Sequence, residues 1–284
     1  MPDLPDAPFM DLQTLRIDTG TDQLLCEIRD RVAVITLNRP EARNALSDQL
    51  SPALRRMIRQ CGDDDAVGAL LITGAGTAFC AGGDVKGMGD NSSKKSMSTE
   101  ERIADLIERE RLMTGALVAV RKPTIAALPG AAAGAGLAIA LACDIRIAAQ
   151  SAFVSAGYAR VGLSGDYGVA WLLTRAVGSP IARELMFTSE RVDSARAERI
   201  GLFNRVVPDD QLRDAAFAMA RTMANGPAVA LRHMKDNLDD VPQIDFDTAL
   251  EREAHRLVSS SQTEDHREAV RAFIEKRPPV FKGR

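Results

Sequence analysis

Two glycine-rich turns in the sequence could present backbone N–H groups to a ligand. The first lies within residues 124–144, which read TIAALPGAAAGAGLAIALACD. The beginning of this stretch has the pattern of a short buried strand, Pro129-Gly130 is typical of a turn, and the apolar spacing from Ala135 onward indicates a buried helix. The first amides of a helix have no partner within it and lie at the positive end of its dipole. This turn is therefore a candidate donor site for an anion or an oxyanion.

The second turn follows another candidate for a buried strand, residues 69–73. Residues 73–86 read TGAGTAFCAGGDVK, and Ala81-Gly82-Gly83 could expose consecutive amides as an anion-binding nest. The polar, low-complexity residues 89–99 come next, and they predict a mobile flap of the kind that covers a site. Two strands are thus expected to end in turns that are rich in free N–H groups.

Two other interpretations of the first stretch are weaker. Residues 125–143 carry no charge over a length that could span a membrane, but they are mostly Ala and Gly and contain Pro129-Gly130. The glycines also suggest a dinucleotide-binding loop, yet Gly134-Ala135-Gly136 is not followed by the third glycine, because position 139 is Ile. The stretch is best interpreted as a tight turn into a buried helix.

The composition describes a soluble globular protein with a large aliphatic core. The chain has 284 residues, a formal charge of -3, 45% apolar residues and 4% aromatic residues. Without a broad basic field, duplex nucleic acid is not expected as a principal partner, although a local basic pocket for a phosphorylated cofactor stays open. No membrane partner is expected either.

The cysteines and histidines argue against disulfide and metal chemistry. The four cysteines show no C-x-x-C spacing, and the N-terminus lacks the order of a secretory signal, so we expect a reduced, cytoplasmic compartment. His233, His255 and His266 lack the spacing of metal ligands and fall in the polar C-terminal third. We therefore predict no metal site.

The elements around the two turns follow a repeated order of strand, helix and strand. Residues 24–28 and 32–37 predict a hairpin, and Ser47 is the expected cap of a helix that continues to Ile58. The strand at residues 69–73 then calls for a parallel, right-handed crossover. The same order recurs with the strand at 124–128, the helix after Ala135 and a strand at 145–148, while a further helix is expected at 100–120. This alternation predicts an α/β core with ligands at the carboxyl ends of its strands.

The chain divides into three expected parts. Residues 1–20 predict a loose arm, residues 21–208 the α/β core, and residues 209–284 a C-terminal helical region. Breaks such as Gly226-Pro227 and Val241-Pro242 separate the predicted helices of the last part, which are 211–225, 228–237, 246–259 and 264–276. Such an appendage is suited to subunit contacts.

Short motifs along nearly the whole chain together resemble the crotonase family of enoyl-CoA hydratases and isomerases. Each motif is modest alone, but their order is specific. They are Asn38-Arg39-Pro40 with Asn44-Ala45-Leu46, FCAGGD at residues 79–84, the stretch from Lys122-Pro123 to Ile145, GLFNRVV at residues 201–207, and FIEKRP at residues 273–278. The resemblance implies an α/β fold with a crotonase-like, repeated ββα spiral core, and an assembly that is a homotrimer or a dimer of trimers.

The resemblance also implies a CoA thioester whose carbonyl oxygen accepts two backbone hydrogen bonds. By their positions in the motifs, Ala81 and Ala135 are the implied donors. CoA is part of the substrate, and no separate cofactor is implied. The residues implied to contact the substrate are Ala81, Gly82, Gly83, Asp84, Val85, Lys86, Ala135, Phe273 and Lys276, the last two reaching a neighbouring subunit's nucleotide. For Lys276, an ordinary exposed helix lysine is an equal alternative.

The chain departs from the family's hydratases in its acidic residues. Where those enzymes have two glutamates that activate water, this chain has Ala138 and Tyr158, and neither can act as a carboxylate base. Asp166 falls where some isomerases carry one catalytic aspartate, although it could instead be the N-cap of a helix that begins at Tyr167. Tyr158 is expected as a pocket wall or a hydrogen-bond donor, and Cys80 as an inert buried thiol.

We therefore expect an isomerase of unsaturated acyl-CoA esters in which Asp166 moves a proton between two carbons and the two amides stabilise the enolate. Hydration with water held by Asp166 and Tyr158, or hydrolysis with Asp166 as the nucleophile, is the alternative within the family. An alternative of another class is a CoA-ester-binding or RNA-binding protein that has lost catalysis.

Overall fold

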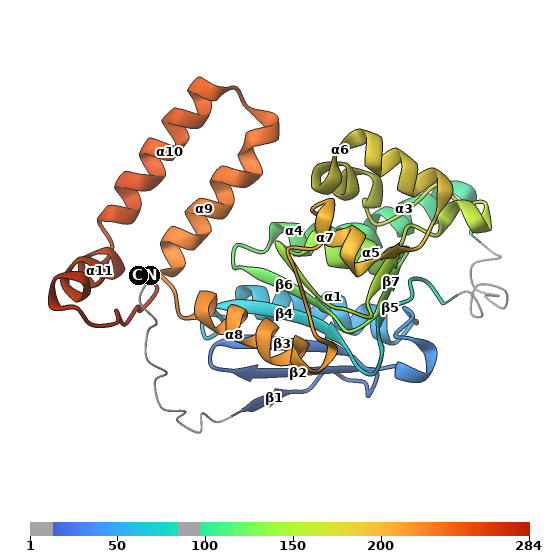
Figure 1. The fold of residues 1–284 in the computed structure, drawn as a ribbon, viewed down its shortest axis with the longest axis horizontal. Helices are drawn as coiled ribbons and strands as arrows, with labels where there is room; N and C mark the ends of the chain where they lie inside the picture. The colour runs from blue at the N-terminus through green and yellow to red at the C-terminus, as the bar shows by residue number, and fades with distance from the viewer. Residues whose placement is uncertain (1–13, 85–96) are drawn as a thin grey trace.

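The computed structural model describes residues 14–84 and 97–284, and Figure 1 shows how their elements are arranged. Val85, Lys86 and most of the predicted flap at 89–99 lie outside the described residues. Two sheets and the helices packed on them form the core, and three helices at the C-terminal end extend away from it (Figure 1).

The larger sheet has seven strands, and its middle is parallel. The strands β1, β2 and β3 pair in antiparallel fashion, whereas β3, β4, β6, β8 and β11 pair in parallel, which confirms both the hairpin and the crossovers predicted from the sequence. In sheet order the strands are β1 (Leu15–Ile17), β2 (Leu24–Arg29), β3 (Val32–Leu37), β4 (Ala69–Gly74), β6 (Thr124–Leu128), β8 (Ile145–Ala149) and β11 (Arg205–Val207).

The smaller sheet carries both glycine-rich turns. Its strands lie in the order β10 (Val192–Asp193), β9 (Phe153–Ser155), β7 (Ala131–Ala133) and β5 (Ala78–Cys80). Each of β5, β7 and β9 follows a strand of the larger sheet directly in the chain, so the path alternates between the two sheets as it advances. This repeated pairing of strands is the predicted ββα spiral, and the carboxyl ends of β5 and β7, which pair in parallel, meet at one edge.

Helix α5 lies at the centre of the core. All eight of its residues are buried, and a helix that is apolar all round belongs inside a protein. The helices among the described residues are α1 (Leu50–Asp63), α3 (Thr99–Glu110), the π-helix η3 (Arg111–Gly115), α4 (Ala116–Ala119), α5 (Ala135–Ala142), α6 (Val169–Thr188), α7 (Ser194–Arg199), α8 (Leu212–Ala224), α9 (Ala228–Asp240), α10 (Phe246–Ser261) and α11 (Glu264–Glu275), with short 3-10 turns η1 (Pro40–Ala42), η4 (Tyr158–Val161), η5 (Asp209–Gln211) and η6 (Val241–Gln243).

Local sequence signals fix where these helices begin. The Ser47 hydroxyl, predicted to cap α1, accepts a hydrogen bond from the Leu50 amide at 3.0 Å, but the N-cap residue of α1 is Gln49. Ser98 caps α3 in a capping box with Glu101. The helix predicted at 100–120 is present, but the π-helix η3 interrupts it.

The predicted limits of the three parts need two corrections. The prediction that residues 1–20 form a loose arm is wrong at Leu15–Ile17. These residues form β1, which pairs with β2 at the edge of the larger sheet. Helix α8 was assigned to the C-terminal helical region, yet it packs on β4 and β6 and its apolar face is buried in the core. The helical region that extends from the core therefore begins with α9.

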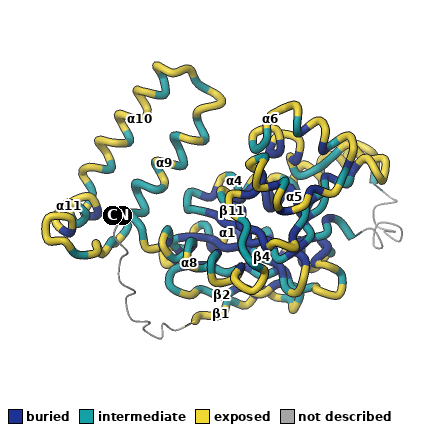
Figure 2. The backbone as a smooth tube through the Cα atoms, in the orientation of Figure 1, coloured by how far each residue is buried: buried dark blue, intermediate teal, exposed yellow. Residues whose placement is uncertain are grey.

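Helix α9 is attached to the core by ion pairs in its C-terminal half, and α10 packs against α9. Lys235 of α9 pairs with Asp144 at 2.9 Å, and Arg121 pairs with Asp239 at 3.3 Å. Figure 2 shows the exposed surface of α10 and α11. Phe246 and Phe273 are 75% and 86% exposed. Among the described helices, none has the length and apolar character needed to cross a membrane.

Candidate active site

The first amide of α5 is free to donate. Gly134 precedes the helix with a φ of +53°, its own N–H donates to the Ser155 carbonyl at 3.1 Å, and its carbonyl accepts from Ala138 at 3.1 Å. Within the described part of the chain, the N–H of Ala135 has no acceptor. Ala135 is therefore placed as the sequence predicted, at the positive end of a buried helix.

A different residue from the predicted one supplies the free amide after β5. The Ala81 N–H donates to the Arg43 carbonyl at 3.0 Å, so the prediction that Ala81 is an oxyanion donor is wrong. Leu46 bridges the same turn: its N–H donates to Gly82 at 2.8 Å and its carbonyl accepts from Asp84 at 3.3 Å. Gly83 lies between Gly82 and Asp84. In such a parallel bridge its N–H points away from the segment of Leu46.

No acceptor for the Gly83 amide is found among residues 14–84 and 97–284. Gly83 belongs to the predicted nest Ala81-Gly82-Gly83, but the resemblance pointed to Ala81 as the donor in it. Of these three adjacent amides, that of Ala81 donates to Arg43 and that of Gly82 hydrogen-bonds to the Cys80 side chain.

The two turns touch each other. A Cβ atom built on Gly82, whose φ is +92°, would lie 2.7 Å from the Ala133 carbonyl and 3.5 Å from the Ala135 nitrogen. A Cβ on Gly136 would lie 2.2 Å from the Cys80 carbonyl. Only glycine fits at such distances, and these glycines let α5 begin directly against the end of β5. The Gly83 turn and the first amide of α5 are thus side by side.

The motif around Asn44 holds the β5 turn in place. Asn44 is fully buried; its side-chain amide donates to the carbonyls of Ala75 and Ala78 at 3.0 and 2.8 Å, and its oxygen accepts from the Arg39 amide at 2.8 Å. The Arg39 guanidinium pairs with Asp84 at 3.2 Å. Asp84, predicted to contact CoA, thus has an ion-pair partner within the chain.

Across from the α5 turn, Tyr158 and Asp166 form a hydrogen-bonded pair. The Tyr158 hydroxyl donates to Oδ1 of Asp166 at 2.5 Å. Tyr158 is 7% exposed, and its hydroxyl lies 3.8 Å from where a Cβ of Gly134 would be. The tyrosine therefore joins the start of α5 to the one carboxyl group that the sequence predicted to be catalytic.

Asp166 is not the N-cap of the following helix. Helix α6 begins at Val169, its N-cap is Gly168, and no side chain caps it. The Asp166 backbone carbonyl, rather than its carboxylate, accepts from the Val169 amide at 3.1 Å. The alternative role considered from the sequence is thus excluded, and the carboxylate is available for chemistry.

The surroundings of Asp166 make its carboxyl group easier to protonate. Burial raises its pKa above the ordinary value, the hydrogen bond from Tyr158 lowers it, and the charge of Glu110 raises it. Burial also raises the pKa of Tyr158 well above its usual range, with the Asp166 hydrogen bond adding to that effect. Tyr158 is therefore a neutral donor at physiological pH.

Glu110 lies beside this pair, and no sequence pattern around it indicates this position. Its Oε1 accepts a hydrogen bond from the Tyr167 amide at 2.9 Å. Glu110 ends α3, which is remote in sequence from Asp166, so only the tertiary structure brings the two carboxyl groups together.

The other predicted site residues have different surroundings. Cys80 is fully buried and burial raises its pKa to about 12, which keeps the thiol protonated and inert, as expected. Phe273 and Lys276 belong to α11 and its C-terminal cap, far from α5 and β5 in the same chain (Figure 1). Val85 and Lys86 fall outside the described residues. In the described part of the chain, no three His, Cys, Asp or Glu side chains cluster as metal ligands would.

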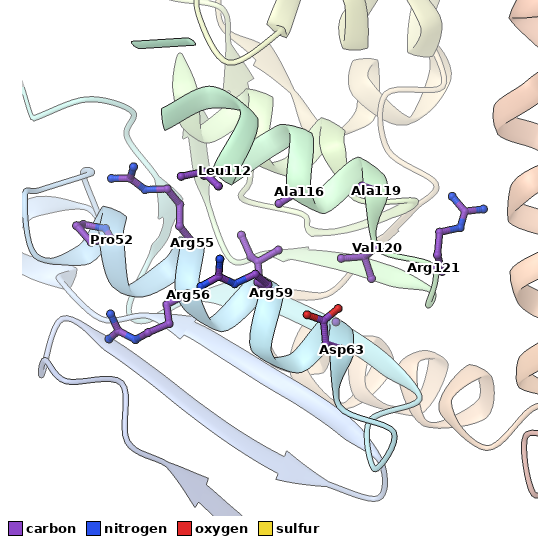
Figure 3. A pocket seen from close by; sticks show the side chains of 12 residues that line it. Pro52, Arg55, Arg56, Arg59, Asp63, Leu112, Ala116, Ala119, Val120 and Arg121 are labelled. Atoms are coloured by element: carbon purple, nitrogen blue, oxygen red, sulfur yellow. The ribbon is translucent and has the colours of Figure 1, made fainter. Parts of the chain in front are cut away.

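A groove of about 690 Å³ lies elsewhere, between α1 and the η3–α4 segment (Figure 3). Its walls include Arg55, Arg56 and Arg59 from α1, with Leu112 and Ala116 opposite. Figure 3 shows the guanidinium groups of Arg55 and Arg56 pointing to different sides rather than into one point. A ligand site needs convergent polar groups, so this groove is not the candidate active site.

Together, the described groups suit one kind of chemistry. Two fixed amides can stabilise an oxyanion, and a carboxyl group with a raised pKa can take up and return a proton.

Comparison with known proteins gives a consistent result. Residues 27–284 match the family model described as enoyl-CoA hydratase/isomerase. The chain is 38% identical over 264 residues to the probable enoyl-CoA hydratase echA8 of Mycobacterium bovis, covering 93% of this chain and 99% of that protein. It is 35% identical over 267 residues to the 1,2-epoxyphenylacetyl-CoA isomerase of Escherichia coli, covering 92% and 98%. Among solved structures, the enoyl-CoA hydratase of Bacillus anthracis superposes with a TM-score of 0.84 at 30% identity, covering 92% of this chain and all of that one.

Proposed function

The chain belongs to the enoyl-CoA hydratase/isomerase family, and we propose that within this family it isomerises an unsaturated acyl-CoA ester with Asp166 as its single acid–base group. The observation that carries this proposal is the Asp166 carboxyl group, which is not used as a helix cap and is hydrogen-bonded to Tyr158, whose hydroxyl lies near Gly134 at the start of α5.

The Gly83 and Ala135 amides form the oxyanion hole of this proposal. Removing a proton next to a thioester carbonyl places negative charge on its oxygen, and two preorganised N–H donors stabilise that charge in the transition state. Each such donor contributes roughly 3 to 4 kcal/mol where donors of this kind have been removed by mutation. Ala135 adds the partial positive charge at the N-terminus of α5.

Asp166 acts first as a base and then as an acid. Its carboxylate takes a proton from one carbon of the acyl group, and the electron pair of the broken C–H bond moves into the enolate. The neutral carboxyl group then returns the proton to a different carbon, and the double bond has moved. One group suffices because the base and its conjugate acid are the same residue. The raised pKa of Asp166 lies closer to the pKa of the carbon acid, which makes its carboxylate a stronger base.

Tyr158 positions Asp166 in this reaction. Its hydroxyl stays protonated and donates to Oδ1, and no hydrogen bond to Oδ2 is found in the described part of the chain. The hydrogen bond is strongest when Asp166 is charged, and it therefore stabilises the state that accepts the proton.

Hydration is the second candidate, and the pair of Tyr158 and Asp166 supports it because the two groups could hold a water molecule. Several relatives carry hydratase names. Hydration is less well supported because Ala138 occupies the position of one of the two hydratase glutamates. Ala138 is fully buried in α5 and its side chain has no polar group. Hydrolysis through Asp166 is a third reaction that the same carboxylate could perform.

Product analysis separates these reactions. The protein is incubated with a panel of 2-enoyl and 3-enoyl CoA esters in water enriched in oxygen-18, and the products are read by mass. Isomerisation gives a product of unchanged mass and a shifted double bond. Hydration adds one labelled water, and hydrolysis releases a free acid with label in the acid or the enzyme. Binding of every ester with no turnover would instead favour a non-catalytic CoA-ester-binding protein.

The C-terminal helices complete the proposal. Phe273 and Lys276 lie too far from the site of their own chain to contact its ligand, while the apolar surface of α10 and α11 is exposed. In a homotrimer or dimer of trimers these residues would contact the CoA nucleotide of a neighbouring subunit. Sedimentation of the protein tests the assembly, and a Lys276→Ala variant with weaker CoA-ester binding only in the oligomer tests the contact.

A further inference from the structure

We infer that Glu110 is a positioning residue for Asp166: it holds the backbone next to Asp166 through the Tyr167 amide and places a second negative charge beside the Asp166 carboxyl group. This inference rests on the proposed role of Asp166 as the acid–base group. Its two parts, a hydrogen bond and a charge, can be separated by substitution.

The hydrogen bond fixes an unusual backbone conformation. Tyr167 has a φ of +52°, a left-handed conformation that costs a non-glycine residue free energy and persists only where the surrounding structure enforces it. The 2.9 Å bond from the Tyr167 amide to Glu110 Oε1 is such a restraint. Because Asp166 directly precedes Tyr167, the same bond limits how far the Asp166 carboxyl group can move from Tyr158.

Glu110 is itself held at a break in helical geometry. It is the last residue of α3, and the π-helix η3 begins immediately after it. Within η3, Met113 and Thr114 are buried, and the Thr114 hydroxyl donates to the Glu110 carbonyl at 3.3 Å. A π-turn in a helix is often found at a functional site, and here it directly follows the residue that bonds to the loop of Asp166.

The charge acts on the same residue. The titratable groups that influence Asp166 are Tyr158 on η4 and Glu110 on α3, and those that influence Tyr167 also include Arg55 on α1 and Arg109 on α3. Arg109 is paired with Asp105 at 2.8 Å. Tyr158 favours the charged form of Asp166, whereas Glu110 favours the neutral form. Glu110 therefore opposes Tyr158 and assists the step in which Asp166 carries the substrate proton.

Two substitutions separate the charge from the hydrogen bond. Glu110→Gln keeps an oxygen that can accept from the Tyr167 amide but removes the charge. Glu110→Ala removes both. Glu108→Gln is the matched control, because it removes an equal charge from the exposed surface of α3 and its side chain makes no hydrogen bond or ion pair with the described residues.

The first measurement does not depend on activity. The carboxyl carbons of aspartate are labelled with carbon-13, the Asp166 signal is assigned by its absence in Asp166→Asn, and its titration is followed in each variant. We expect Glu110→Gln to move the Asp166 midpoint to lower pH and Glu108→Gln to leave it in place. An Asp166 midpoint that is the same in Glu110→Gln and in the unmodified protein would overturn the charge half of the inference.

The second measurement tests positioning. A small displacement of a catalytic group lowers the rate more than it weakens substrate binding. We therefore expect Glu110→Ala to lower kcat by about tenfold or more with KM little changed. We expect Glu110→Gln to retain most of kcat at its own optimum pH. Equal kcat in the two variants would overturn the positioning half. Full activity of Asp166→Asn would contradict the proposed function itself. The titration of Asp166 in the Glu110 variants would still show whether Glu110 changes the pKa of Asp166.

Discussion

The Tyr158 hydroxyl lies 2.5 Å from Oδ1 of Asp166 and places that carboxyl group next to the first turn of α5. This hydrogen bond joins the two halves of the candidate site, since Tyr158 follows β9 and contacts Gly134, whereas Asp166 lies in the loop before α6. The proposed chemistry depends on this relationship, because it holds the proton-accepting carboxyl group near the amides that would stabilise the enolate.

Tyr158→Phe should raise the pKa of Asp166. The tyrosine hydrogen bond is the influence that lowers this pKa, so its loss leaves burial and the Glu110 charge to raise it. The acid limb of the kcat/KM profile should move to higher pH, opposite to the shift expected for Glu110→Gln, and activity near neutral pH should fall. An acid limb that stays in place or moves to lower pH contradicts the role given to Tyr158.

Gly83→Pro should remove one oxyanion donor. Proline has no amide hydrogen, so the loss of this donor is expected to lower kcat by about 100-fold to 1,000-fold while CoA-ester binding persists. Gly83→Ala keeps the amide and serves as the control. Similar kcat values for the two variants would show that the Gly83 amide does not contact the oxyanion.

Asp166→Asn should stabilise the fold at neutral pH. Because burial raises the folded-state pKa of Asp166 above its unfolded value of about 3.9, the unmodified protein loses stability as pH rises through the folded pKa. The gain from the neutral Asn side chain should therefore be small below pH 4, grow above it, and level off once Asp166 is fully charged. Urea denaturation at several pH values measures this, and a gain that shrinks with rising pH would contradict a raised pKa.

The sequence predicted the elements well because their signals are local. The strand β6 and the first residue of α5 follow from an uninterrupted apolar run, a Pro-Gly turn and helical spacing, all within residues 124–144. The first residues of α9 and α10, Ala228 and Phe246, are likewise as predicted, whereas both helices continue past their predicted ends, to Asp240 and Ser261. Helix α8 could not be assigned to the core from sequence alone, because its amphipathic pattern does not say which surface it covers.

The errors at the site come from contacts between distant segments. The prediction of Ala81 was wrong because its N–H donates to the Arg43 carbonyl of an earlier loop. Among the described residues it is the Gly83 N–H that has no acceptor. The alternative of Asp166 as a helix cap failed because Tyr167 and Gly168 both adopt positive φ and move the helix start to Val169. Glu110 was missed because nothing near it in the sequence indicates a partner on the loop before α6.

The role of Asp166 is tested most directly by following exchange of the acidic protons of a bound acyl-CoA ester with deuterated solvent, in the unmodified protein and in Asp166→Asn. We predict exchange in the unmodified protein and a loss of at least 100-fold in Asp166→Asn with CoA-ester binding retained, in line with the contribution of about 100-fold or more from a positioned acid–base group. Undiminished exchange in Asp166→Asn would contradict the assignment of Asp166 as the proton carrier and, with it, the proposed isomerase mechanism.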